Sequence, residues 1–173
     1  MAYGLLLLRV VIGGTLFAHG AQKLFGWWGG PGPAGTKGWL GSMGFRIPGV
    51  LALAVGLAEG SGLLFAFGFL TPFAAIGMTS AMLVAIVSVH LSKGFWLSNG
   101  GYEYNLVLVA ATVGVAAIGP GRFSLDRAFG WDDNWWGGRW GLGVLVVAAV
   151  GAAIVLGLLR TTPPAAPAAA TEE

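Results

Sequence analysis

The sequence predicts an all-α integral membrane protein, in which a four-helix bundle is followed by an appended fifth transmembrane helix. Apolar residues make up 56% of the 173-residue chain, and charged residues only 9%, against roughly 25% in soluble domains. The apolar residues also form long blocks, and a block of about 18 or more can cross a bilayer. So few charges cannot coat a soluble globule, which excludes a soluble enzyme.

The chain contains no cysteine. This excludes disulfides, thiolate catalysis and ligation of an iron–sulfur cluster by this chain. A redox role would therefore need a bound organic carrier, a partner subunit or another metal. The net charge is +2, and the nine basic residues are scattered along the chain. That pattern indicates basic loops of a membrane protein rather than a nucleic-acid partner, so the expected partner is the lipid bilayer.

The first predicted span runs from Gly4 to Phe25, with Tyr3 at one end and Trp27-Trp28 at the other as interfacial aromatics. No basic stretch precedes it, so we read it as a retained helix rather than a signal peptide. The Gly- and Pro-rich segment from residue 29 to 46 is predicted to be a loop. Within this loop, Thr36 could cap a short interfacial turn.

Two further spans are predicted from Pro48 to Leu70 and from Pro72 to Leu91, with Thr71 as the N-cap of the latter. Because almost nothing separates them, they should form an antiparallel hairpin. Gly56 and Gly60 have the GxxxG spacing of close helix contacts.

The fourth span, from Tyr102 to Ile118, is shorter, and the fifth runs from Leu142 to Leu159. The expected organisation is a four-helix domain (1–128), an interfacial linker with the extra helix (129–160) and a disordered tail (161–173). The distribution of basic residues does not decide the orientation in the membrane.

Ionisable residues inside apolar spans are costly, so each needs a reason. At about 100° per residue, Arg9, His19 and Lys23 share one face of the first helix. Glu59 lies near the centre of the second span, where a lone carboxylate needs a partner. We expect Arg9 to be that partner in a structural ion pair, with His19 as the second choice.

Alternating helix directions bring the ends of the first and third spans to the same side as the start of the fourth. We therefore predict a pocket on that side, with Trp27 or Trp28 near its mouth, lined by His19, Lys23, Glu59, His90 and Glu103. Simpler explanations remain open: the lysines can be snorkelling anchors, and Glu103 can favour a helix N-terminus. No HxxxH or ExxH spacing is present, so no metal site is predicted.

Several segments in order resemble the DoxX family of small bacterial membrane proteins: LLLLRVVIGGTLFAHGAQKLFGWWGGPG, GLAEGSGLLFAFGFLTP, VHLSKGFWLSNGGYEYNLVL and IGPGRFSLDR. The resemblance covers residues 4–128 and includes Arg9, His19, Lys23 and Glu59. It implies four membrane helices and a multi-pass protein of the bacterial inner membrane. Related DoxD-type proteins are associated with quinone-linked oxidation of thiosulfate, and DoxX proteins more loosely with membrane oxidoreductase systems.

The favoured hypothesis is a component of a membrane oxidoreductase system with a quinone-like lipophilic carrier near the polar cluster. An imidazole can donate a hydrogen bond to a quinone oxygen and changes protonation near neutral pH. A redox partner subunit would supply the electrons, and whether the chain is itself an enzyme stays open. The alternatives are a small-solute or proton carrier and a non-catalytic structural or assembly subunit.

Overall fold

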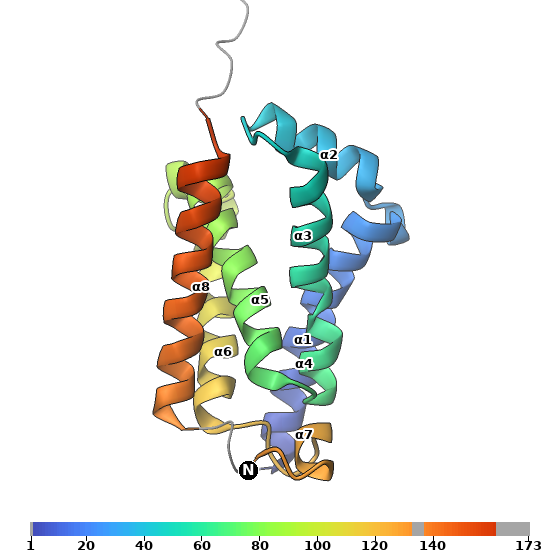
Figure 1. The fold of residues 1–173 in the computed structure, drawn as a ribbon, viewed down its shortest axis with the longest axis vertical. Coiled ribbons are helices and arrows are strands. Elements are labelled where there is room, and N and C mark those ends of the chain that lie inside the picture. The colour runs from blue at the N-terminus through green and yellow to red at the C-terminus, as the bar shows by residue number, and fades with distance from the viewer. Residues whose placement is uncertain (1, 133–136, 162–173) are drawn as a thin grey trace, which may run out of the picture.

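The structure is a computed structural model that describes residues 2–132 and 137–161. The regular structure of these residues is helical, without a β-strand (Figure 1). The α-helices are α1 (Ala2–Phe25), α2 (Gly32–Ser42), α3 (Pro48–Gly60), α4 (Gly62–Phe67), α5 (Thr71–Ala85), α6 (Glu103–Ile118), α7 (Leu125–Ala128) and α8 (Gly138–Leu159). The shorter turns are η1 (Trp27–Gly29), η2 (Ile86–His90), η3 (Leu91–Lys93) and η4 (Leu97–Asn99).

Four helical segments are long and apolar enough to cross a membrane: Ala2–Phe25, Pro48–Phe67, Thr71–Lys93 and Gly138–Leu159. The helix Glu103–Ile118 is apolar but shorter. The all-α membrane fold is therefore confirmed, and α8 is the predicted fifth apolar helix. Exposed aromatic residues occur at both ends of the bundle, as at the two interfaces of a membrane; they are Tyr3, Phe123 and Phe129 at one end and Phe25, Trp27, Trp28 and Trp96 at the other.

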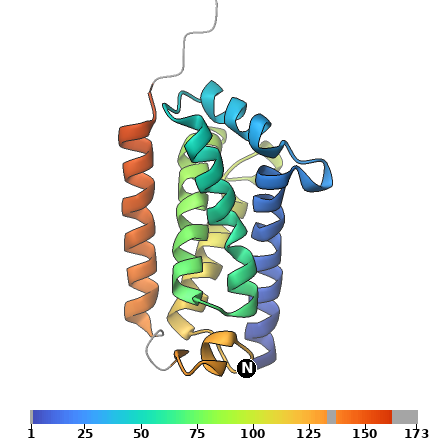
Figure 2. The ribbon, with the colours of Figure 1, turned by 45° about the vertical axis from the view of Figure 1, so that its right-hand side comes forward.

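Helix α1 packs on α3 and α4, while α5 packs on α6 and α8. Figure 2 shows α8 at the outside of the bundle, with α2 across one end and α7 at the other. The end that carries α2 is called the α2 end below, and the opposite end the α7 end.

Glycines allow α1 to approach α3 and α4 very closely. A Cβ at Gly20 would overlap the backbone of Gly56 and Gly60, and one at Gly13 would overlap that of Gly62. Small residues at such a contact let two membrane helices pack backbone against backbone. The predicted role of Gly56 and Gly60 in helix contact is confirmed, and Gly20 is the partner on α1.

The tightly packed core lies between the middle of the bundle and the α7 end. Leu16, Phe65 and Met78 are fully buried there, and Val115 is almost so. The Thr79 and Thr112 hydroxyls, also fully buried, satisfy each other in a 2.9 Å hydrogen bond. This half of the bundle interior is therefore filled by side chains.

The N-terminus of α5 is capped from a distant part of the chain. The Asp126 carboxylate accepts hydrogen bonds from the backbone N–H groups of Leu70 (2.7 Å) and Thr71 (3.0 Å). The Thr71 hydroxyl also donates to it, at 2.6 Å. The prediction of Thr71 as N-cap is therefore wrong, because the fully buried Asp126 supplies the stronger, charged acceptor.

The segment between the first two spans is more ordered than predicted, because Gly32–Ser42 forms helix α2. Thr36 lies inside this helix and donates its hydroxyl hydrogen to the Gly32 carbonyl at 2.8 Å, so it is not the cap. Thr36 and Leu40, one turn apart, are both buried, and α2 packs on α3. This tertiary burial offsets the low helix propensity of the glycines.

The end of α8 is joined to the loop between α2 and α3. The Arg46 N–H donates to the Leu159 carbonyl, and the Thr161 N–H donates to the Gly44 carbonyl, both at 2.8 Å. Phe45 and Arg160 form an isolated antiparallel bridge between these bonds. We call residues 43–46 with 159–161 the clasp. The predicted tail, 161–173, otherwise lies outside the described residues.

Candidate functional site

A cavity of about 570 Å³ occupies the half of the bundle interior nearest the α2 end. Its walls come from α1, α3, α5, α6 and α8, and the segment from Trp39 to Phe45 lines it at the α2 end. Most of the lining side chains are apolar. The polar side chains on its wall are His19, Lys23, Glu59, Ser80, Ser88, His90, Tyr104 and Asn105.

The Lys23 ammonium and the Glu59 carboxylate form an ion pair on this wall. Their side chains are only 17% and 6% exposed, so the pair is largely removed from solvent. His19, one turn before Lys23, lies within electrostatic range of the Glu59 carboxylate. Three of the predicted residues therefore lie together on α1 and α3.

The predicted ion pair between Arg9 and Glu59 does not form. The Arg9 guanidinium, buried at 1% exposure, donates instead to the backbone carbonyls of Pro120 and Phe123 near the α7 end. Asp126 is the carboxylate that attracts it electrostatically. Because Lys23 has a long flexible stem, its ammonium reaches Glu59, whereas Arg9 lies too far toward the other end of α1.

His90 reaches the cavity from the end of the third span, where the α-helix widens into the π-helical turn η2. Such turns often occur at functional sites. The His90 Nδ1 lies 2.7 Å from the Gly100 carbonyl oxygen, which can only accept a hydrogen bond. Nδ1 therefore carries the proton, and in the neutral ring Nε2 is the basic nitrogen.

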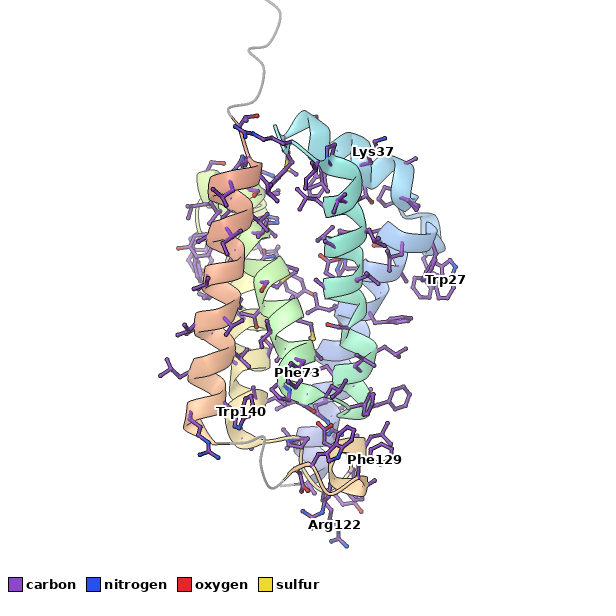
Figure 3. All side chains as sticks on the ribbon, viewed as in Figure 1. Trp27, Lys37, Phe73, Arg122, Phe129 and Trp140 are labelled. Atoms are coloured by element: carbon purple, nitrogen blue, oxygen red, sulfur yellow. The ribbon has the colours of Figure 1, made fainter. Side chains whose placement is uncertain are left out.

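Glu103 is not on the cavity wall, contrary to the prediction, and Trp27 and Trp28, predicted to lie near the mouth, do not line the cavity either. The Glu103 carboxylate accepts a 2.9 Å hydrogen bond from the Leu97 N–H at the start of α6. Glu103 therefore lies in the first turn of α6, where a carboxylate favours the helix N-terminus, rather than in the site. Trp27 and Trp28 are 48% and 67% exposed, and Figure 3 shows Trp27 on the outer side of the bundle. Trp39 lines the cavity at the α2 end instead.

Sequence reasoning missed Asn105 and Ser88. Asn105 is 6% exposed, and its amide donates toward the Met82 sulfur at 3.3 Å. The Ser88 Oγ is buried and has no hydrogen-bond partner within the part of the chain that the structure describes. Asn105 could have been found, because an amide inside an apolar span is as costly as a histidine. Ser88 carries no such signal, since serine is common in membrane helices.

The arrangement suits an amphiphilic ligand. An ammonium, a carboxylate and two imidazoles provide hydrogen-bond donors and acceptors, while the alanines, valines and leucines around them exclude water. Among residues 2–132 and 137–161, no three His, Asp or Glu side chains gather as metal ligands would.

Comparison with known proteins agrees with this architecture. The DoxX family model matches residues 4–91, which run from the first turn of α1 to beyond the end of α5. The chain is also 30% identical over 131 residues to an uncharacterized protein of Haemophilus influenzae, a match that covers 70% of this chain and 80% of that protein. No solved structure matches the chain. The match to the family model over half of its length shows that the chain belongs to the DoxX family.

Proposed function

We propose that this protein is a component of an oxidoreductase system of the bacterial inner membrane and binds a quinone-like lipophilic carrier in the cavity. The observation that carries the proposal is the Lys23–Glu59 pair, with His19 beside it, on the wall of a cavity of about 570 Å³ that is otherwise mainly apolar. Cavities that bind small molecules measure about 300 to 1,000 Å³ and combine apolar walls with a few polar groups.

The residues on the wall fit the chemistry of a quinone. A bound quinone would supply two-electron, two-proton redox chemistry. The Lys23 ammonium and the imidazole of His19 can donate hydrogen bonds to a ring oxygen. The Glu59 carboxylate and the basic Nε2 of His90 can accept hydrogen bonds from the hydroxyls of the reduced form, the quinol.

Ser88 supports the same occupant. Its buried hydroxyl has no partner among the described residues, and an unsatisfied buried donor is costly. A polar ligand in the cavity would give this hydroxyl an acceptor. Because the chain has no cysteine, the electrons would come from a redox partner subunit with its own cofactor.

The packed half of the bundle argues against the alternative of a solute or proton carrier. A carrier needs polar groups along a path between both faces of the membrane. The cavity instead ends at Leu16 and Leu108, beyond which Phe65, Met78 and Val115 fill the interior. A cavity that is confined to one half of the bundle suits a subunit that binds a ligand rather than one that conducts it.

The test is binding of decylubiquinone to the purified protein in lipid nanodiscs. We expect saturable binding that His19→Ala and Glu59→Gln weaken by about tenfold or more. His19→Ala removes a donor to a ring oxygen, and Glu59→Gln removes the charge that holds the Lys23 ammonium on the cavity wall. Glu103→Gln is the matched control for the carboxylate, because Glu103 lies off the cavity wall. Its affinity should equal that of the wild type.

Two results would contradict the proposal. The first is absence of saturable binding by the wild-type protein. The second is an equal effect of Glu59→Gln and Glu103→Gln on the affinity. A proton or solute flux into liposomes that depends on Glu59 would favour the carrier instead.

A further inference from the structure

The cavity is chemically divided between two sides. Lys23, Glu59 and His19 lie on α1 and α3, and they form its polar side. The wall contributed by α8 consists only of Gly151, Ala152 and Val155, and the facing wall of α3 includes Leu51, Ala54 and Val55. One side therefore suits a polar head, and the other suits a hydrocarbon chain.

The apolar side coincides with a seam between α3 and α8. These two helices make little direct contact, because α8 packs on α5 and α6 while α3 packs on α1, α2 and α5. Figure 1 shows α3 and α8 on opposite sides of α5. Ala54 both lines the cavity and is exposed on the surface of the bundle. The cavity therefore opens at this seam toward the lipid.

Two buried side chains cover part of the cavity at the α2 end. Leu40 and Phe45, both less than 7% exposed, cover the cavity there. The clasp holds this cover to the end of α8 through the Arg46–Leu159 and Thr161–Gly44 backbone hydrogen bonds. The Arg160 guanidinium adds a contact over the Phe45 ring, 5.8 Å from its centroid.

Between α1 and α6, the lining of the cavity is polar rather than apolar. The residues that line the cavity there include His19 and Tyr104, both exposed, and an imidazole and a phenol make a poor surface for a hydrocarbon chain. The seam between α3 and α8 has mainly small and apolar walls, with the Ser80 hydroxyl beside Gly151 as a polar neighbour.

We propose that the ligand is an amphiphile with a small polar head and one long apolar tail, which enters from the bilayer through the seam between α3 and α8. The head lies against Lys23 and Glu59, and the tail lies in the seam between Ala54 and Gly151. This inference rests on the proposed function and specifies the class of carrier: a tailed, membrane-borne quinone. The extra helix α8 builds half of the tail site.

The experiment compares two probes, decylubiquinone and dimethoxy-methyl-benzoquinone, which is the same head without a tail. Two variants narrow the seam, Ala54→Phe on α3 and Gly151→Leu on α8. A Cβ at Gly151 would meet only the Ser80 hydroxyl, at an ordinary 3.6 Å, so space exists for a side chain. The matched control is Ala153→Phe, because Ala153 is exposed on α8 but does not line the cavity.

Both seam variants should lower the affinity for decylubiquinone by about tenfold or more, which corresponds to about two buried methylenes. Their affinity for the tail-less head, and both affinities of the control, should match those of the wild type. If Ala54→Phe fails to fold, Gly151→Leu carries the test.

The possible failures are distinguishable. If the wild-type protein binds both probes but the seam variants affect both equally, or affect neither, the tail site is refuted and the proposed function stands. If the wild type binds the two probes with equal affinity, the seam likewise holds no tail. If it binds neither, the proposed function is refuted and the tail site with it.

Discussion

The ion pair between Lys23 and Glu59 makes a quantitative prediction through three variants: Lys23→Met, Glu59→Gln and the double substitution. Methionine keeps most of the length of lysine without its charge, and glutamine keeps the shape of glutamate. The Glu59 side chain is 6% exposed, and that of Lys23 is 17% exposed. Each single variant therefore leaves a charge that water solvates poorly.

The two single variants should differ in cost. Lys23→Met leaves a buried carboxylate without its cation, and breaking a buried pair in this way costs about 3 to 5 kcal/mol. Glu59→Gln leaves the ammonium, whose flexible stem can reach the open part of the cavity, so we expect about 1 to 3 kcal/mol. The double variant should cost less than the sum, with a coupling of about 2 to 3 kcal/mol.

The assay is reversible unfolding in mixed micelles with a rising fraction of denaturing detergent, followed by circular dichroism. A control cycle of Lys37→Met with Glu103→Gln should be additive, because neither Lys37 nor Glu103 takes part in an ion pair within the described part of the chain. A second cycle of Arg9→Met with Glu59→Gln should also be additive, since these residues do not touch. Additivity in the Lys23–Glu59 cycle, or coupling between Arg9 and Glu59, would refute this assignment of the pair.

Three further predictions use the same unfolding assay. Asp126→Ala removes three hydrogen bonds from the start of α5 and should lower the free energy of unfolding by about 3 to 5 kcal/mol. The control Asp132→Ala breaks only the exposed pair with Arg127 and should lower it by about 0 to 1 kcal/mol. Equal losses of stability in the two variants would contradict the capping role of Asp126. Gly20→Ala forces a Cβ into the backbone of Gly60 and should lower the free energy of unfolding by about 1 to 3 kcal/mol. At Gly14 a Cβ meets nothing within 4 Å, so the control Gly14→Ala should stabilise the helix by about 0.5 to 1 kcal/mol. Unchanged stability of Gly20→Ala would count against the close contact. Arg9→Lys replaces a planar fork that serves two carbonyls and should cost about 1 to 3 kcal/mol; unchanged stability would show that one of the two hydrogen bonds is dispensable.

Much of the fold could be predicted because membrane spans are a local property of the sequence. The spans predicted to start at Gly4 and Pro48 correspond to the helices Ala2–Phe25 and Pro48–Phe67. Helix α2 was not predicted, because its glycines lower local helix propensity, and its stability comes from the burial of Thr36 and Leu40. Its order depends on contacts that no local pattern contains.

The candidate site was predicted in part. The alternating directions of the helices predict that His19, Lys23, Glu59 and His90 lie around one pocket, and all four line the cavity. Topology alone could not place Glu103, because rotation about the helix axis turns its neighbours Tyr104 and Asn105 to the cavity instead. The partner of Glu59 also depended on side-chain reach, which sequence spacing within α1 does not reveal.

The sequence by itself determined that the chain is a helical membrane protein with costly polar groups inside its spans, because the free energy of transfer into lipid depends on local composition. Only the tertiary structure decided which charges meet, that Asp126 caps α5, and that α8 and the clasp enclose one half of a cavity. The physical reason is that pairing and enclosure depend on helix rotation, side-chain length and contacts between segments far apart in the sequence. Lys23 and Glu59 are 36 positions apart, and Asp126 and Leu70 are 56 apart.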